Sequence, residues 1–379
     1  NGGWDYCDGV AIHPYAQAPN PIQQRLDLCL RNVNNFIAGY EKPKPVWITE
    51  AGWKTGSSTT EEMQAVSVFQ TYVICMANKI QNFDYFCMDN YDNWGLIRDV
   101  NTIPYPCNPK SSYTALKLLT QALGSPGPAA AFDGYLQMPA NVACYVFRKP
   151  GTSRVLILWN NDGLTRTIQL PQTSGLTAID ILNRPVTITN GALTLGADPI
   201  IVTGADATLI GTVSTSYNPH IIAKGTNIIF NGTLDCTPPS NPGNWSVGRF
   251  NTPGNTGTCA SSTAGRNGST CVSVTGSTGQ GAWSSAVVPV EPGKSYRISG
   301  WVKTNKATGT NCISIAWYAG NMFTWRGESR TQSLTGTNDW TYVTASGTAG
   351  PDTAFIHVFL ESDNNTGTTW FDDVSVVEE

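Results

Sequence analysis

One glutamate in the N-terminal part of the sequence follows a short apolar run and stands where acid chemistry could occur. The run Val46–Ile48 lies between Pro45 and Gly52, and Glu50 comes two residues after it. A continuous apolar run bounded by Pro and Gly is typical of a buried parallel strand. In an α/β barrel the reacting groups gather where the strands end, so Glu50 is a candidate catalytic carboxylate. The same pattern also fits a glutamate that opens a solvated loop.

Two other short apolar runs end on polar and aromatic side chains. Residues 10–12 lead into His13 and Tyr15, and residues 85–89 lead into Asn90 and Trp94. A neutral aromatic ring with polar neighbours at a strand exit is suited to holding a ligand beside a reactive group. Trp53, three residues beyond Glu50, is a further candidate for ligand contact.

Helical patterns separate and follow these runs. Apolar residues recur at three- and four-residue spacing over 22–40, over 63–80 and over 113–123, and Thr59 with Glu62 forms a capping box before the second segment. Strands that alternate with helices predict a parallel sheet with helices packed against it. We therefore expect α/β structure over residues 1–125.

From residue 126 onward the pattern changes to short strands. Seven apolar runs separated by Gly, Asn and Asp fall within residues 131–204, which predicts a small β-sandwich over 126–204. Residues 205–226 are of mixed polarity and are expected to connect two domains. Residues 227–379 alternate with a period of two and predict an antiparallel β jelly roll.

Aromatic residues are frequent in this last block. Flat rings bind the C–H-rich faces of sugar rings, because such contacts bury apolar area without fixing the hydroxyl pattern. Trp317, Tyr318, Phe323 and Trp325 flank a Gly/Asn turn and are candidates for glycan binding, although core packing fits them equally well. For Trp301 and Trp370, each inside a predicted strand, core packing is the preferred interpretation.

The composition favours an extracellular protein. Only 13% of the 379 residues are charged, against roughly 25% in ordinary soluble domains, and the formal net charge is −4. The absence of a Lys/Arg run in the sequence argues against nucleic acid or an anionic membrane as partner. The chain does not start with Met or with an apolar leader, so we expect it to be processed or to be a fragment.

Ten cysteines without a C-x-x-C pair and three histidines make a zinc cluster improbable, and no metal site is expected. The four cysteines of the last block, Cys236, Cys259, Cys271 and Cys312, are expected to form disulfides with one another, in an order left open. Sequons at Asn231, Asn244, Asn267 and Asn364 predict glycosylation in a eukaryotic source. No cofactor is expected, and a structural calcium in the jelly roll stays an open alternative.

These motifs resemble the last three strands of a clan A glycoside hydrolase barrel. His13-Pro14-Tyr15, Ile48–Trp53 and Asn90–Trp94 occur in the order of that family's sixth, seventh and eighth strands. The resemblance implies that Glu50 is the nucleophile of a retaining mechanism, that Tyr15 orients it with support from His13, and that Trp94 forms the floor of a sugar subsite. Residues 126–204 are similar to an accessory β-domain of such enzymes, and residues 227–379 look like a jelly-roll carbohydrate-binding module.

The sequence departs from the family in one important respect. A complete (β/α)8 barrel needs eight strand–helix units, and the resemblance covers only three, without the fourth strand that carries the acid/base in this clan. The first hypothesis is thus a secreted retaining β-glycosidase acting on a polysaccharide, with the rest of the barrel supplied by an upstream segment or a second chain. The alternative is a non-catalytic extracellular or cell-wall glycan-binding protein with a degenerate barrel.

Overall fold

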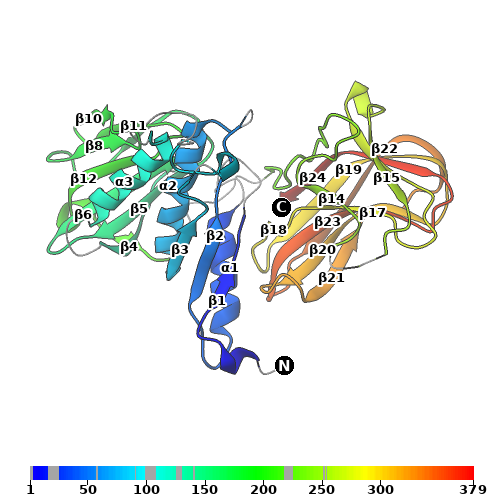
Figure 1. Ribbon diagram of the computed structural model, residues 1–379, viewed down its shortest axis with the longest axis horizontal. Helices are drawn as coiled ribbons and strands as arrows, with labels where there is room; N and C mark the ends of the chain where they lie inside the picture. The colour runs from blue at the N-terminus through cyan, green and yellow to red at the C-terminus, as the bar shows by residue number, and fades with distance from the viewer. Residues whose placement is uncertain are drawn as a thin grey trace. The chain divides into compact units, whose positions relative to one another are not determined.

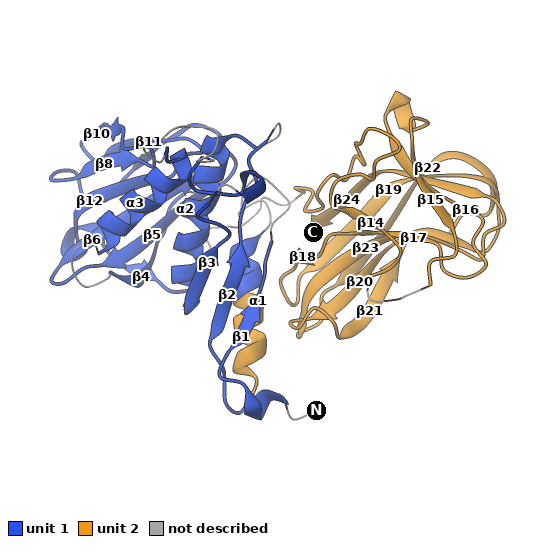
Figure 2. Cartoon of the chain, in the orientation of Figure 1, with its two compact units in different colours: residues 1–30, 41–222 blue, residues 31–40, 223–379 orange. Residues whose placement is uncertain are grey.

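The computed structural model describes residues 3–15, 25–56, 59–89, 91–98, 108–124, 130–139, 141–216, 225–250, 252 and 254–379. The chain divides into two compact units, one formed by residues 1–30 and 41–222 and the other by residues 31–40 and 223–379 (Figure 2). Among the described residues, no helix is both long and apolar enough to cross a membrane.

The first unit begins with three parallel strands in the order β1-β2-β3 (Figure 1). The strands are β1 (Val10–Ile12), β2 (Val46–Ala51) and β3 (Asn82–Tyr85), and the longer helices are α2 (Glu61–Ala77) and α3 (Ser111–Leu123). Helix α1 (Leu26–Ala38) belongs to this unit only as far as Leu30. Short 3-10 turns cover Gly3–Tyr6 and Tyr91–Asn93. The predicted alternation of parallel strands and helices is confirmed.

The two faces of β2 differ in burial. Val46 and Ile48 are buried, and Ile48 packs in one core cluster with Leu30, Phe69 and others, whereas Trp47 and Thr49 are exposed. The alternation follows from the two-residue period of a strand. One face of the strand is thus covered by helices and the other carries an indole that is 41% exposed.

The rest of this unit is a β-sandwich. Its larger sheet has the order β13-β4-β5-β6-β12-β8-β9 and its smaller sheet the order β10-β11-β7. The strands are β4 (Ala131–Leu136), β5 (Val142–Arg148), β6 (Ser153–Asn160), β7 (Arg166–Gln169), β8 (Thr177–Asp180), β9 (Pro185–Val186), β10 (Ile188–Thr189), β11 (Ala192–Leu195), β12 (Ile200–Asp206) and β13 (Val213–Ser214), with the short helix α4 (Ala207–Ile210).

Both faces of the larger sheet are buried. On one face Cys144 and Leu158 pack against Ile168 and Leu193 of the smaller sheet. On the other face Trp159 belongs to the cluster that also contains residues of α2 and α3, and Figure 1 shows these helices against β5. This double burial explains the nearly continuous apolar runs of β5 and β6. The segment expected to be a connection, 205–226, contributes β13, which pairs with β4.

The second unit is a sandwich of two antiparallel sheets, as predicted for this block. We call them the β20 sheet, β14-β17-β23-β20-β21 with β18 paired to β23, and the β19 sheet, β15-β16-β24-β19-β22. The first contains β14 (Trp245–Val247), β17 (Ala282–Ser285), β18 (Val288–Pro289), β20 (Thr310–Ala319), β21 (Trp325–Arg330) and β23 (Thr353–Asp363). The second contains β15 (Thr258–Ser262), β16 (Cys271–Thr275), β19 (Ser295–Ala307), β22 (Gly336–Thr348) and β24 (Thr368–Glu378), and a 3-10 turn covers Arg266–Gly268.

Candidate functional site

The carboxyl ends of β1 and β2 bring two of the predicted residues into contact. The parallel register pairs Ile12 with Ile48, so the residues that follow emerge at the same edge. Pairing of β2 with β3 shifts between Ile48 and Ala51, and Glu50 lies at this irregularity. The Tyr15 hydroxyl donates a hydrogen bond to Oε1 of Glu50.

The Tyr15 phenol is held in its protonated form. Burial, and next to it the hydrogen bond and negative charge of Glu50, raise the pKa of Tyr15 above its usual value. A phenol that keeps its proton remains a donor, and its hydrogen bond fixes the direction of the carboxylate. His13 does not take part in this contact, because its Nε2 lies 2.9 Å from Oγ1 of Thr49.

Trp94 also lies at this edge. Its ring is partly exposed and packs edge-on against Tyr15, with 5.7 Å between the ring centroids. On another side Phe86 supports it, at 6.0 Å between centroids. Trp94 therefore lies beside the Tyr15–Glu50 pair, while Asn90 lies outside the described residues, and a role of either in substrate binding stays a prediction.

Trp53 is buried in the core of the first unit. It is only 4% exposed and packs with Val68 and Leu96, so its ring forms part of the core rather than a surface for a ligand. Its backbone carbonyl accepts a 2.7 Å hydrogen bond from Nε2 of Gln64, which also donates to the Trp94 carbonyl at 3.1 Å.

Gln64 is a residue that sequence reasoning missed. Its side chain on α2 is fully buried, and its Oε1 accepts a 2.8 Å hydrogen bond from the Ser112 hydroxyl of α3. One amide thus joins α2 and α3 to the loops that follow β2 and β3. A polar residue at an inward position of an apolar helix was the available signal.

We expect Gln64→Leu to destabilise the first unit by about 1–3 kcal/mol, because two buried carbonyls and one hydroxyl each lose a partner. Thermal and urea unfolding of the full chain measure this change. Gln121→Leu on the exposed side of α3 is the matched control and should leave unfolding nearly unchanged. Equal unfolding curves for the two variants would contradict the role of Gln64.

A buried lysine joins the same loops. Nζ of Lys110, a residue only 3% exposed, donates at 3.1 Å both to Oγ1 of Thr55 and to the carbonyl of Asn93. Burial lowers the pKa of Lys110. Together with Gln64 it fixes the backbone that carries Trp94.

In the second unit the four predicted rings separate onto two faces of the β20 sheet. Neighbouring residues of a strand point to opposite faces. Trp317 points into the core, where it is 5% exposed, lies 6.3 Å from the ring of Tyr296 and donates to Oγ of Ser329 at 3.2 Å. Tyr318 points to the other face, where its ring contacts Phe250 at 5.8 Å.

Phe323 and Trp325 are the exposed members, at 61% and 57%. The register between β20 and β21 shifts so that Tyr318 is opposite Trp325. Because opposite residues of antiparallel strands share a face, the shift places the Trp325 ring on the same face as Tyr318. Phe323, Trp325 and Tyr318, together with Phe250, form what we call the ring surface.

Phe250 and His357 were not predicted from the sequence. Phe250 stacks on Phe323, with centroids 6.0 Å apart and planes at 26°, and on His357, at 4.2 Å and 18°. His357 in turn lies parallel to Phe359 at 6.2 Å. Phe250 comes from the connection between β14 and β15, and nothing in its local sequence marks it as a partner of β23.

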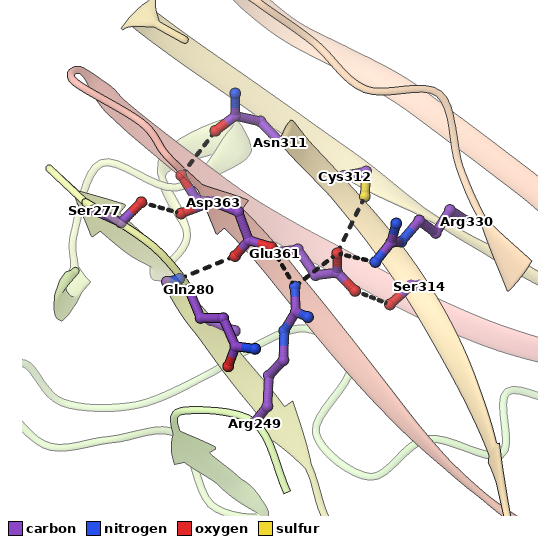
Figure 3. A network of polar contacts seen from close by, with 12 residues as sticks. Arg249, Ser277, Gln280, Asn311, Cys312, Ser314, Arg330, Glu361 and Asp363 are labelled. Atoms are coloured by element: carbon purple, nitrogen blue, oxygen red, sulfur yellow. Dashed lines mark hydrogen bonds and ion pairs between the residues drawn. The ribbon is translucent and has the colours of Figure 1, made fainter. Parts of the chain in front are cut away.

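A charged network continues along this face of the β20 sheet (Figure 3). Nη2 of Arg249 lies 2.9 Å from Oε2 of Glu361 and 2.6 Å from Oδ2 of Asp363, and Nη2 of Arg330 lies 3.3 Å from Oε2 of Glu361. Ser314 donates to Oε1 of Glu361 at 2.5 Å. Burial raises the pKa of Glu361, and the charge of Arg249 opposes that shift.

His357 makes the stability of the second unit depend on pH. Burial lowers its pKa from 6.5 to about 4, so the unfolded chain binds a proton near pH 6 that the folded chain does not. The free energy of unfolding should therefore fall between about pH 6.5 and 4, by about 3 kcal/mol in total. Unfolding of the full chain at pH 7 and pH 4 measures the loss, and His357→Asn should show a smaller loss than the unchanged protein.

The expected disulfides are absent among the described residues. Cys236, Cys259, Cys271 and Cys312 are all free thiols in the structure, which contradicts the predicted pairing. Cys312 lies in the β20 sheet with its sulfur 3.8 Å from Oε2 of Glu361, whereas Cys259 lies in the β19 sheet and faces the Ala282 carbonyl at 3.5 Å. The two cysteines thus belong to different sheets, and each sulfur contacts a polar atom of the β20 sheet.

The sequon asparagines differ in exposure. Asn267 and Asn364 are exposed, whereas Asn244 is partly buried. Nδ2 of Asn231 donates to the Asp235 and Gly243 carbonyls at 2.9 and 3.3 Å. Glycosylation stays a prediction at all four.

The described residues contain no group of three or more His, Cys, Asp or Glu side chains that could hold a metal ion. A calcium site in the second unit stays untested.

Comparison with known proteins identifies the second unit. Residues 226–366 match the profile of the carbohydrate binding domain family CBM_4_9. This part of the chain is a carbohydrate-binding domain. No curated protein sequence matches the chain.

Solved structures similar to the chain include modules of this kind. A family 4 carbohydrate-binding module is 22% identical and matches 40% of this chain and 99% of its own, with a TM-score of 0.30. An endo-1,4-beta-D-xylanase of Clostridium thermocellum with xylohexaose is 18% identical over 36% of this chain and 26% of its own, with a TM-score of 0.29. A tailspike protein of bacteriophage CBA120 is 14% identical over 40% of this chain, with a TM-score of 0.33. The chain thus spans about a fifth of the tailspike structure (21%) and about a quarter of the xylanase structure (26%).

Proposed function

We propose that this protein binds an extracellular polysaccharide through the ring surface of its carbohydrate-binding domain. The observation that carries the proposal is the exposure of Phe323 and Trp325 on the same face as Tyr318. Large rings are normally buried, and two neighbouring rings exposed by more than half are suited to stack on sugar rings. Phe250 packs beneath Phe323, which limits the motion of that ring before a ligand binds.

Electrophoresis of the full chain through native gels that contain a dissolved polysaccharide tests this proposal. We expect slower migration in at least one gel of a panel containing barley β-glucan, laminarin, xylan and glucomannan, compared with a gel without polysaccharide. Bovine serum albumin run beside it corrects for the sieving effect of each polymer. Unchanged relative migration in every gel would contradict the proposal, and the gel that retards the chain identifies the glycan.

A second proposed function concerns the first unit, which we infer to be part of a retaining β-glycoside hydrolase. The hydrogen bond from Tyr15 to Glu50 supports it, because a nucleophilic carboxylate must be fixed in direction before it attacks. Trp94 beside this pair offers an apolar surface for a sugar ring. Glu50 is then the nucleophile, Tyr15 its orienting residue, and His13 acts indirectly through Thr49.

Such a mechanism needs a second carboxyl group. In retaining glycosidases the two groups lie about 5–5.5 Å apart, one attacking and the other protonating the leaving oxygen. In this proposal the parallel strands β1, β2 and β3 would be three of the eight strands of a barrel. The exposed Trp47 and Thr49 lie on the face that points inward in a closed barrel. We propose that additional strands, from an upstream segment or a second chain, cover this face and supply the acid/base.

The alternative is that the first unit has no catalytic role and that the protein only binds glycan. Both proposals place the protein outside the cell. The low content of charged residues and the four sequons are in keeping with this location. Activity of a completed barrel, and its dependence on Glu50, separates the two.

A further inference from the structure

The imidazole of His357 lies under the ring surface and is fixed on one side only. It is 4% exposed, and its Nδ1 lies 2.9 Å from the Ser285 carbonyl of the neighbouring strand β17. A carbonyl only accepts hydrogen bonds, so Nδ1 carries the proton and Nε2 carries a lone pair. Among the described residues no donor reaches Nε2, although this atom is buried.

Three rings pack around the imidazole: Phe250, Tyr318 and Phe359, with ring centroids at 4.2, 5.6 and 6.2 Å. Phe250 lies nearly parallel to it at 4.2 Å, so this ring covers a face of the imidazole. A hydrogen bond to Nε2 forms in the plane of the ring, at its edge, and therefore does not compete with this stacking. Burial lowers the pKa of His357 to about 4, which keeps the ring neutral and Nε2 an acceptor at neutral pH.

A second buried polar atom of this face also has no partner in the described part of the chain. It is Nε of Arg249, a donor. The Arg249 guanidinium lies 5.9 Å from the centroid of the Phe359 ring, and His357 lies on the same strand as Phe359 at 6.2 Å. An unused acceptor and an unused donor thus lie near one phenylalanine. Since buried polar atoms normally have partners, both point to a ligand that accepts and donates, as a hydroxyl group does.

We propose that Nε2 of His357 accepts a hydrogen bond from a hydroxyl group of the bound glycan, and that this contact contributes to the choice of glycan. The proposal rests on the proposed glycan binding by the ring surface. Stacking on Phe323 and Trp325 tolerates many hydroxyl patterns, whereas a buried acceptor requires a hydroxyl at one position. His357 is therefore expected to discriminate between glycans that the rings alone would bind alike.

Two substitutions separate the two nitrogens of the imidazole. In His357→Asn the amide nitrogen replaces Nδ1 and can still donate to the Ser285 carbonyl, but no atom replaces Nε2. In His357→Gln the side-chain amide reaches the position of Nε2 and offers an acceptor there. Isothermal titration of the full chain measures the glycan affinity of each variant. The ligand is the hexasaccharide of the polysaccharide that slows the unchanged protein in the native gels, and the temperature is well below the unfolding temperature of each variant.

We expect His357→Asn to weaken binding about tenfold, the effect of one lost hydrogen bond, and His357→Gln to bind within about threefold of the unchanged protein. For a hexasaccharide with a different backbone linkage, His357→Asn should lower the affinity by a smaller factor. Equal affinity of His357→Asn and the unchanged protein would overturn the role of Nε2 while leaving glycan binding intact. Equal weakening in both variants would also overturn it. Failure of the unchanged protein to bind any glycan would overturn the proposed function itself.

Discussion

In a protein that contains the completed barrel, Glu50→Gln is expected to abolish hydrolysis of aryl β-glycosides. The amide keeps the shape of the carboxyl group and can still contact the Tyr15 hydroxyl, but it cannot attack the anomeric carbon. Loss of a covalent nucleophile lowers turnover by roughly 10⁴-fold or more. Release of nitrophenol by the completed protein, with and without the substitution, measures the effect.

Two comparisons make this result specific. Residues 1–379 alone should show only background release, because the barrel strand that would carry the general acid is not among β1, β2 and β3, and general acid catalysis is worth about 10²–10⁴-fold. Glu41→Gln changes an exposed glutamate of the same unit and should leave the completed enzyme unaffected. A completed barrel in which Glu50→Gln retains full turnover would refute the assignment of Glu50, and rapid hydrolysis by residues 1–379 alone would refute the need for a further acid.

Removing the exposed rings of the carbohydrate-binding domain is expected to cause the second large effect. Phe323→Ala and Trp325→Ala should each weaken glycan binding by about tenfold or more, since an aromatic stack contributes about 0.5–1.5 kcal/mol beyond the apolar area that it buries. The double variant should bind at least about a hundredfold more weakly. Isothermal titration of the full chain with a glycan hexasaccharide measures these losses.

Tyr342→Ala is the matched control for the ring variants. Tyr342 is 48% exposed but lies on β22, in the β19 sheet. Its removal should leave affinity unchanged, and none of the three substitutions should greatly lower the unfolding temperature, because all three rings are largely in solvent. If Tyr342→Ala weakened binding as much as Trp325→Ala, glycan binding would not be confined to the ring surface.

The sequence predicts those parts of the fold that depend on local periodicity. The strand of Glu50 and the exit that carries Tyr15 were found because buried parallel strands read as short apolar runs between Pro and Gly. The sequence could also place both residues at one edge, since parallel strands end together. The start of α2 was predicted one residue too early, because Thr60 rather than Thr59 accepts the hydrogen bond from the Met63 amide.

Side-chain direction was less predictable where a strand is irregular. The period of two separates Trp317 from Tyr318, but the register shift that turns Trp325 to the face of Tyr318 has no local signal. Trp53 was misjudged for a similar reason: it follows the irregular end of β2, and its ring is taken into the core with Leu96. Phe250 and His357 are more than a hundred residues apart, so only the folded chain shows that they stack.

Fluorine NMR of the full chain labelled with 5-fluorotryptophan tests most directly whether the glycan lies on the ring surface. The twelve tryptophans each give a resonance, and those of Trp325 and Trp317 are assigned by their loss in Trp325→Phe and Trp317→Phe. The ligand is the hexasaccharide of the polysaccharide that slows the chain in native gels. As it is added, the Trp325 resonance should shift until binding saturates, whereas the resonance of Trp317, in the core, should stay in place. Saturable binding that leaves the Trp325 resonance unshifted would contradict the account.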